Sequence, residues 1–158
     1  MKRPQKVVAY IVHGDRLLVF VHADDEQFDQ SGLQVPAGTV RDGELLEQAV
    51  LREAFEETAL HGLRIERYLG VAEWDVRPYA DAVHVRHFFH LSVEGTEVPD
   101  RWIAVERGDG DGEPIRFELY WLPLAQGHVL AAGQSALLGR LFDRPPQSAS
   151  LEDRSRLS

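Results

Sequence analysis

Apolar residues near the start of the chain fall in two short runs, residues 6–12 and 16–22, both rich in β-branched side chains. Runs of this length and composition are typical of β-strands. Gly14 and Asp15 lie between the runs and favour a tight turn. The pattern therefore predicts a β-hairpin at the N-terminus.

After this hairpin the sequence predicts two loops and then a helix. Residues 23–33 are polar and predict a loop, and 33–35 predict a short extended piece that ends at Pro36. Two glycines mark 37–43 as a second loop. From 44 to 60 the apolar residues recur three and four positions apart, which predicts a long amphipathic helix.

The second half of the chain predicts strands followed by one more helix. Strands are expected at 63–72, 82–93 and 115–122, with a connection at 74–81 and a short strand near 102–105 inside a polar, glycine-rich loop at 94–114. An amphipathic helix is expected at 133–142 and a frayed tail at 144–158. This order predicts one domain over 1–143, of the α+β class, with a mixed β-sheet flanked by helices.

Composition narrows the classes of function. The chain has 158 residues, 44% hydrophobic and 27% charged, which is typical of a globular domain. Its net charge of -9 argues against broad nucleic-acid binding, and no apolar run reaches the roughly 20 residues that span a bilayer. We therefore expect a cytoplasmic protein with no nucleic-acid or membrane partner, and the oligomeric state stays open, a homodimer included. With 0 cysteines, disulfides, thiolate zinc sites and cysteine nucleophiles are excluded.

The predicted helix at 44–60 carries an acidic edge. Glu53, Glu56 and Glu57 are three and four positions apart and share one face. Like charges at this spacing repel, so a divalent cation with hard oxygen ligands, Mg²⁺ above all, would stabilise the group. The alternative is an ordinary solvated face with an Arg52–Glu56 pair. The apolar residues expected to pack on the sheet are Val50, Leu51, Ala54, Phe55 and Thr58.

The segment from Gly38 to Leu60 resembles the box of the Nudix hydrolase family, G-x5-E-x7-R-E-U-x-E-E-x-G-U, where U is a bulky apolar residue. The match is complete at the charged and glycine positions through the last glutamate, namely Gly38, Glu44, Arg52, Glu53, Glu56 and Glu57. Ala59 replaces the final glycine, which suits a left-handed helix cap, and alanine there costs roughly 1–2 kcal/mol. The helix keeps that backbone at this cost, or it ends later, at Gly62.

The resemblance implies a fold and a reaction. The fold is a Nudix-like α/β/α sandwich, and the reaction is Mg-dependent hydrolysis of a phosphate-anhydride bond in a nucleoside diphosphate linked to another group, with Mn as a substitute metal. The implied metal ligands are Glu53, Glu56, Glu57 and the backbone carbonyl of Ala37. Arg52 would orient the glutamates, Glu44 would tie the loop to the helix, and the implied catalytic residues are Glu53, Arg52 and Glu56.

The general base and the substrate stay open at this point. Glu53 is the first choice for the base, and Glu113 and Glu118 are alternatives that could equally be surface carboxylates. Trp74 and Tyr79 could stack on a base or pack internally. His84 and Arg86, on one strand face, could contact phosphate or face solvent. ADP-ribose, dinucleoside polyphosphates and oxidised nucleoside triphosphates all remain candidates.

A second class of function is a Nudix-like module that senses a nucleotide-type small molecule without cleaving it. Such modules usually carry degraded boxes and an added DNA-binding domain. The complete carboxylate set at Glu53, Glu56 and Glu57 favours the hydrolase.

Overall fold

The structure is a computed structural model that describes residues 1–23, 32–95, 97–106 and 113–143. Its central strand, β1 (Gln5–His13), turns back into β2 (Arg16–His22). Gly14, in the turn, has a φ of 65°, the left-handed conformation that glycine adopts without strain. The predicted N-terminal hairpin is confirmed.

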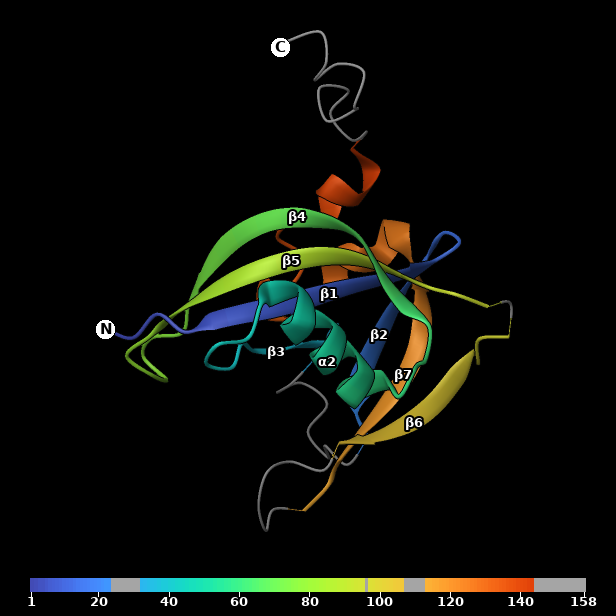
Figure 1. Ribbon diagram of the computed structural model, residues 1–158, viewed down its shortest axis with the longest axis horizontal. Coiled ribbons are helices and arrows are strands. Elements are labelled where there is room, and N and C mark those ends of the chain that lie inside the picture. Colours follow the sequence, from blue (N-terminus) through green and yellow to red (C-terminus); the bar gives the residue numbers. More distant parts are fainter. Residues whose placement is uncertain (24–31, 96, 107–112, 144–158) are drawn as a thin grey trace, which may run out of the picture.

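Within the described part of the chain, seven strands form one mixed sheet, which confirms the predicted α+β class (Figure 1). The remaining strands are β3 (Ala37–Thr39), β4 (Leu63–Asp75), β5 (Val83–Val93), β6 (Arg101–Glu106) and β7 (Ile115–Pro123). The order is β4-β5-β1-β2-β7-β6, with β3 paired to β1. β1 runs parallel to β5, and the other strand pairs are antiparallel.

The short strand β3 occupies a segment that the sequence predicted as loop. β1 and β2 pair only next to their turn, because the segment 34–39 then lies between them: Gln34 bonds to Phe20 of β2, and Pro36 bonds to Ala9 of β1. The N-terminal half of β1 offers an edge to this segment, and β3 pairs with Lys6, Val7 and Val8 along it. This edge comes from a distant part of the chain, so the local loop signals of 37–43 do not reveal the pairing.

A different layer covers each face of the sheet. On one face α2 (Leu46–Thr58) packs through Val50 and Ala54. The other face is covered by the C-terminal segment, with its two 3-10 helices η1 (Leu124–Val129) and η2 (Leu138–Phe142). Figure 1 shows α2 in front of β1, orange turns behind the sheet, and the red turn beyond β4 at the top of the view. Buried on both faces, β1 reads as a continuous apolar run.

The prediction of an amphipathic helix at 133–142 is wrong. Only the last five of these residues are helical, and they form a 3-10 helix. Two glycines, Gly133 and Gly139, weaken helix formation in this short segment. Gln134, 6% exposed, binds the core instead. Its backbone carbonyl accepts a hydrogen bond from the Tyr10 hydroxyl, and its side-chain oxygen accepts one from the Val35 amide at 2.8 Å. These bonds hold the segment against the sheet as a series of turns.

α2 is shorter than the predicted helix at both ends. At the start, the Gln48 side-chain oxygen accepts a hydrogen bond from the Leu45 amide at 3.0 Å. At the end, Ala59 has a φ of 60° and donates its amide hydrogen to the Phe55 carbonyl at 2.8 Å. The helix exit therefore keeps the left-handed cap with alanine in place of glycine, and Gly62 does not extend the helix.

We expect Ala59→Gly to stabilise the protein. Glycine removes the strain of a left-handed alanine, and the larger entropy of an unfolded glycine offsets part of this gain. The net increase in the free energy of unfolding should be about 0.5–1 kcal/mol, measured by urea denaturation. Ala80→Gly, at an exposed residue outside the left-handed region, is the control and should give no increase. A lower denaturation midpoint for Ala59→Gly would contradict the strain assigned to this cap.

Three further points bear on the sequence predictions. β4 extends to Asp75, so Trp74 lies on a strand and not in the predicted connection. No helix among the described residues is long and apolar enough to cross a membrane. The predicted tail at 144–158, and most of the predicted loop at 23–33, lie outside the described residues.

Candidate functional site

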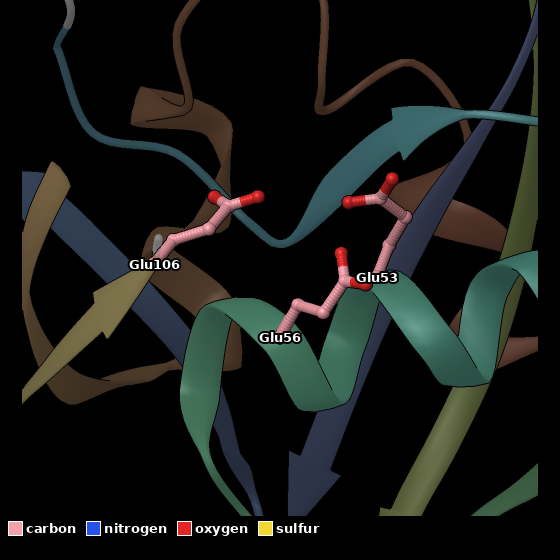
Figure 2. Close-up of side chains that lie close together, drawn as sticks. All are labelled: Glu53, Glu56 and Glu106. Carbon is pink, nitrogen blue, oxygen red and sulfur yellow. The ribbon is translucent and has the colours of Figure 1, made fainter. Parts of the chain in front are cut away.

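Three carboxylates from two distant elements meet beside β3. Glu53 and Glu56 extend from α2 and Glu106 from the end of β6, and Figure 2 shows all three directed toward one space. One oxygen of each lies within 4.8 Å of the others. Hard oxygen atoms this close together form a donor set suited to a divalent cation such as Mg²⁺.

Glu106 was not among the predicted site residues. Glu106 is the last residue of β6. The sequence predicted only a polar loop there, with a short strand near 102–105. No local pattern connects this strand with α2, and the two come together only because β6 is the edge strand next to β7. Tertiary structure alone therefore identifies Glu106.

Glu57 lies beside this group but is buried, with 8% exposure. Its carboxylate accepts a hydrogen bond from the Ala37 amide at 2.8 Å, which ties α2 to β3. Burial raises the pKa of Glu57 well above its ordinary value, against the lowering effect of the Ala37 hydrogen bond. The Ala37 amide thus binds the Glu57 carboxylate. That the Ala37 carbonyl is a metal ligand stays a prediction.

Arg52 links the acidic residues to each other. Its guanidinium donates two hydrogen bonds to Glu44, at 2.7 and 2.9 Å, and one to Glu53 at 2.8 Å. Further bonds reach Glu56 at 3.3 Å and the Thr39 carbonyl at 3.0 Å. The hydrogen bonds from Arg52 and from the Arg41 amide lower the pKa of Glu44 to about 2. Arg52 therefore holds the carboxylates in place, and its strongest ion pair is the one with Glu44.

The acidic group keeps uncompensated negative charge despite this arginine. Burial raises the pKa of Glu53, and the charge of Glu56 adds to the effect while Arg52 opposes it. The pKa of Glu106 is also raised, first by burial and then by Glu53 and Glu56. Burial and mutual repulsion both disfavour the ionised forms of these carboxylates. A cation bound between them would offset both effects.

Gly38 leaves the space that this arrangement requires. A Cβ atom at this position would lie 2.0 Å from the carboxyl carbon of Glu53. Real atoms cannot approach so closely, so any side chain would displace the carboxylate. Glycine here therefore leaves room for the Glu53 carboxylate in the position that it occupies beside β3.

The acidic group opens into a cleft of about 940 Å³ between the 37–42 segment, α2 and the end of β6. Arg41, Phe55 and Val105 contribute to its walls. Phe55 was expected to pack on the sheet, but it is 47% exposed, because the buried stripe of α2 is narrower than predicted. The cleft is therefore large enough for a small-molecule substrate.

A model of the NUDIX domain matches residues 2–140. The chain belongs to the Nudix family. Nudix hydrolases are pyrophosphohydrolases that typically use divalent metals, so the family and the carboxylate cluster point to the same chemistry. No curated protein matches the sequence.

Solved structures share the Nudix fold at low sequence identity. The MutT protein from Methanosarcina mazei Go1 matches with a TM-score of 0.62 and 16% identity, over 99% of this chain and 97% of that one. A NUDIX hydrolase from Nitrosomonas europaea matches with a TM-score of 0.60 and 22% identity, over 89% and 86%. A UDP-X diphosphatase matches with a TM-score of 0.60 and 15% identity, over 90% of this chain but 64% of its own length.

The other candidates of this Nudix chain are not among the residues that line this cleft. Neither Glu113 nor Glu118 lines the cleft, and Glu118 forms an ion pair with Arg101. Tyr79 is 96% exposed. Trp74, His84 and Arg86 lie on β4 and β5, outside the walls of this cleft.

Proposed function

We propose that this protein hydrolyses a phosphate-anhydride bond in a nucleoside diphosphate linked to another group, with Mg²⁺ as cofactor and Mn²⁺ as a substitute. The observation that carries the proposal is the set of three carboxylates, Glu53, Glu56 and Glu106, with oxygens within 4.8 Å at the base of an open cleft. A protein with a net charge of -9 repels an anionic substrate. A cation bound between the carboxylates and the phosphate would reduce this repulsion.

The donor set fits a divalent cation. Glu53, Glu56 and Glu106 would hold it, and we retain Glu57 and the Ala37 carbonyl as further ligands. When bound, such an ion polarises the phosphoryl oxygens and lowers the pKa of the attacking water. Arg52 positions Glu53 and Glu56 through the hydrogen bonds at 2.8 and 3.3 Å.

Proton transfer from water is assigned to Glu53, with Glu106 as the alternative. Burial raises the pKa of both carboxylates, which brings them nearer to neutral pH, where a general base works best. Glu106 replaces Glu113 and Glu118 as the second candidate, because those two do not line the cleft.

A substrate panel tests this function. Nucleotide sugars, dinucleoside polyphosphates, ADP-ribose and nucleoside triphosphates, normal and oxidised, are incubated with the protein, and phosphate-bearing products are separated by ion-exchange chromatography. We expect turnover of at least one class with Mg²⁺ or Mn²⁺ and none with a chelator. Nucleotide sugars are included because one structural match is a UDP-X diphosphatase.

The sensing module makes the opposite prediction for the same panel. It would bind a nucleotide tightly and release no product with any metal. That result would reject the hydrolase, whereas metal-dependent turnover would reject the sensor.

A further inference from the structure

A second charged group lies beside β3, on the strands β1 and β5. Lys6 on β1 and Arg86 on β5 are register partners in the parallel pair, so their side chains lie next to each other on one face. His84, two residues before Arg86, shares that face. In a chain with 26 acidic and 17 basic residues, three adjacent side chains of basic type stand out.

The described part of the protein does not neutralise the charges of Lys6 and Arg86, and a lowered pKa leaves the neighbouring His84 imidazole neutral at pH 7. Among the described residues, no carboxylate forms an ion pair with Lys6, His84 or Arg86. Burial lowers the pKa of all three, and their mutual repulsion lowers the pKa of His84 further. An anion bound between them would relieve both effects.

Arg86 is held in place before any ligand binds. Its guanidinium carbon lies 5.3 Å from the centre of the Trp74 ring, and one nitrogen donates to the Ala132 carbonyl. The neighbouring Gly133 closes on the same ring, where a Cβ atom would lie 2.5 Å from Trp74. Because a guanidinium has five N–H donors, most of them remain available to an oxyanion.

Lys6 connects this group to the carboxylate site. Its ammonium nitrogen donates to the Thr39 hydroxyl at 2.5 Å, and the Thr39 carbonyl accepts from Arg52 at 3.0 Å. Glu53 is also close enough to raise the pKa of Lys6. Thr39 thus lies between Lys6 and the arginine that holds the carboxylates, and Lys6 is the member of the group nearest to the carboxylate site.

A cavity of about 290 Å³ lies beside Arg86, which is the member of the group that lines it. Trp74, Arg86 and Phe88 line it on the sheet side, and Gly133 and Ser135 on the side of the C-terminal segment. An aromatic wall beside a guanidinium suits a flat or sugar-sized group attached to a phosphate.

We propose that Lys6, His84 and Arg86 form an anion subsite that binds the substrate phosphate farther from Glu53, and that the cavity beside Trp74 receives the group carried by this phosphate. The proposal rests on the proposed function, since it deepens the binding mode of the same substrate. It selects substrates in which a diphosphate is flanked by groups on both sides, with one phosphate at the carboxylates and the other at the cations.

Methylenediphosphonate, a diphosphate mimic that resists hydrolysis and has no base, is the probe. Its binding to the Mg²⁺-saturated protein is measured by calorimetry, and Mn²⁺ binding is measured separately by electron paramagnetic resonance. Lys6→Met and Arg86→Met should each weaken probe binding by about 10- to 100-fold, the loss expected for a charge-assisted hydrogen bond. Mn²⁺ affinity of Arg86→Met should stay within about twofold of wild type, because Arg86 does not line the carboxylate cleft. Lys6→Met should bind Mn²⁺ at least as tightly as wild type, because it removes a positive charge close to Glu53.

Arg64→Met is the matched control, because Arg64 is an exposed arginine on β4 whose side chain is 64% accessible. It should bind the probe like wild type. Circular dichroism establishes that each variant is folded. Equal probe affinity of wild type, Lys6→Met and Arg86→Met would overturn the subsite.

A measurement on the wild-type protein does not depend on the variants folding. The probe should shift the imidazole NMR signals of His84 and leave those of His128, exposed on η1, unchanged. Absence of a His84 shift at saturating probe would also overturn the proposal. Failure of the proposed hydrolase function would give a different result. The protein would then neither bind Mn²⁺ nor turn over any substrate, but the probe would still shift the His84 signals.

Discussion

Replacing Glu53 with glutamine should lower kcat/KM by about 10³-fold or more, which corresponds to about 4 kcal/mol of transition-state stabilisation. Glu53 belongs to the carboxylate group, contacts Arg52 and lies against Gly38, so its charge acts at the centre of the proposed metal site. Glutamine keeps the size of the side chain and removes the charge. Steady-state kinetics at saturating Mg²⁺, on the substrate found in the panel, measure the loss.

Glu47→Gln is the control for Glu53→Gln. Glu47 is an exposed carboxylate in the first turn of the same helix, outside the walls of the cleft. Its replacement removes one charge from α2 without touching the site, so activity should stay within about twofold of wild type. Near-normal turnover of Glu53→Gln at saturating metal would show that Glu53 is neither ligand nor base.

Glu57→Gln should separate activity from stability. We expect kcat/KM to fall by about 10²- to 10³-fold, because a charged group next to the reacting phosphate is lost. The metal-free variant should nevertheless be more stable than wild type at pH 8. Burial of an ionised carboxylate without a cation costs free energy, and glutamine keeps an oxygen that can accept from the Ala37 amide.

The pH dependence of this stabilisation follows from the raised pKa of Glu57. In the folded state the protonated form is favoured, so its contribution to stability is fully present below the ordinary pKa of 4.5 and is lost as the pH rises through the higher folded-state pKa. Glutamine does not titrate and loses nothing. The Tm difference between variant and wild type without metal should therefore grow from pH 5 to pH 8, by about 2–4 °C for each kcal/mol.

Added Mg²⁺ should reverse the order of stability. Wild type gains stability from a ligand that binds only the folded state, and Glu57→Gln gains less. Differential scanning calorimetry with a chelator and with excess Mg²⁺ compares the two proteins. A metal-free Glu57→Gln that is less stable than wild type at pH 8 would mean that the Ala37 hydrogen bond outweighs the cost of the buried charge.

Sequence reasoning succeeded where the information was local. The spacing of Glu53, Glu56 and Glu57 placed them on one edge of the helix, and two β-branched apolar runs around a Gly-Asp turn predicted the N-terminal hairpin. It failed where a residue's surroundings came from elsewhere. Phe55 was assigned to the buried stripe and is exposed, while Glu57 is buried because β3 lies over the helix at Ala37.

The sequence by itself determined the fold class, the family and the acidic helix edge, because helix periodicity and a fixed motif spacing are properties of neighbouring residues. Only the tertiary structure decided which distant groups join them. Strand pairing brings Glu106 to the carboxylates, sets Gly38 against Glu53, and places Lys6 beside Arg86. Register and strand order in a mixed sheet depend on the whole chain, and so the composition of the site beyond α2 could not be read from any single segment.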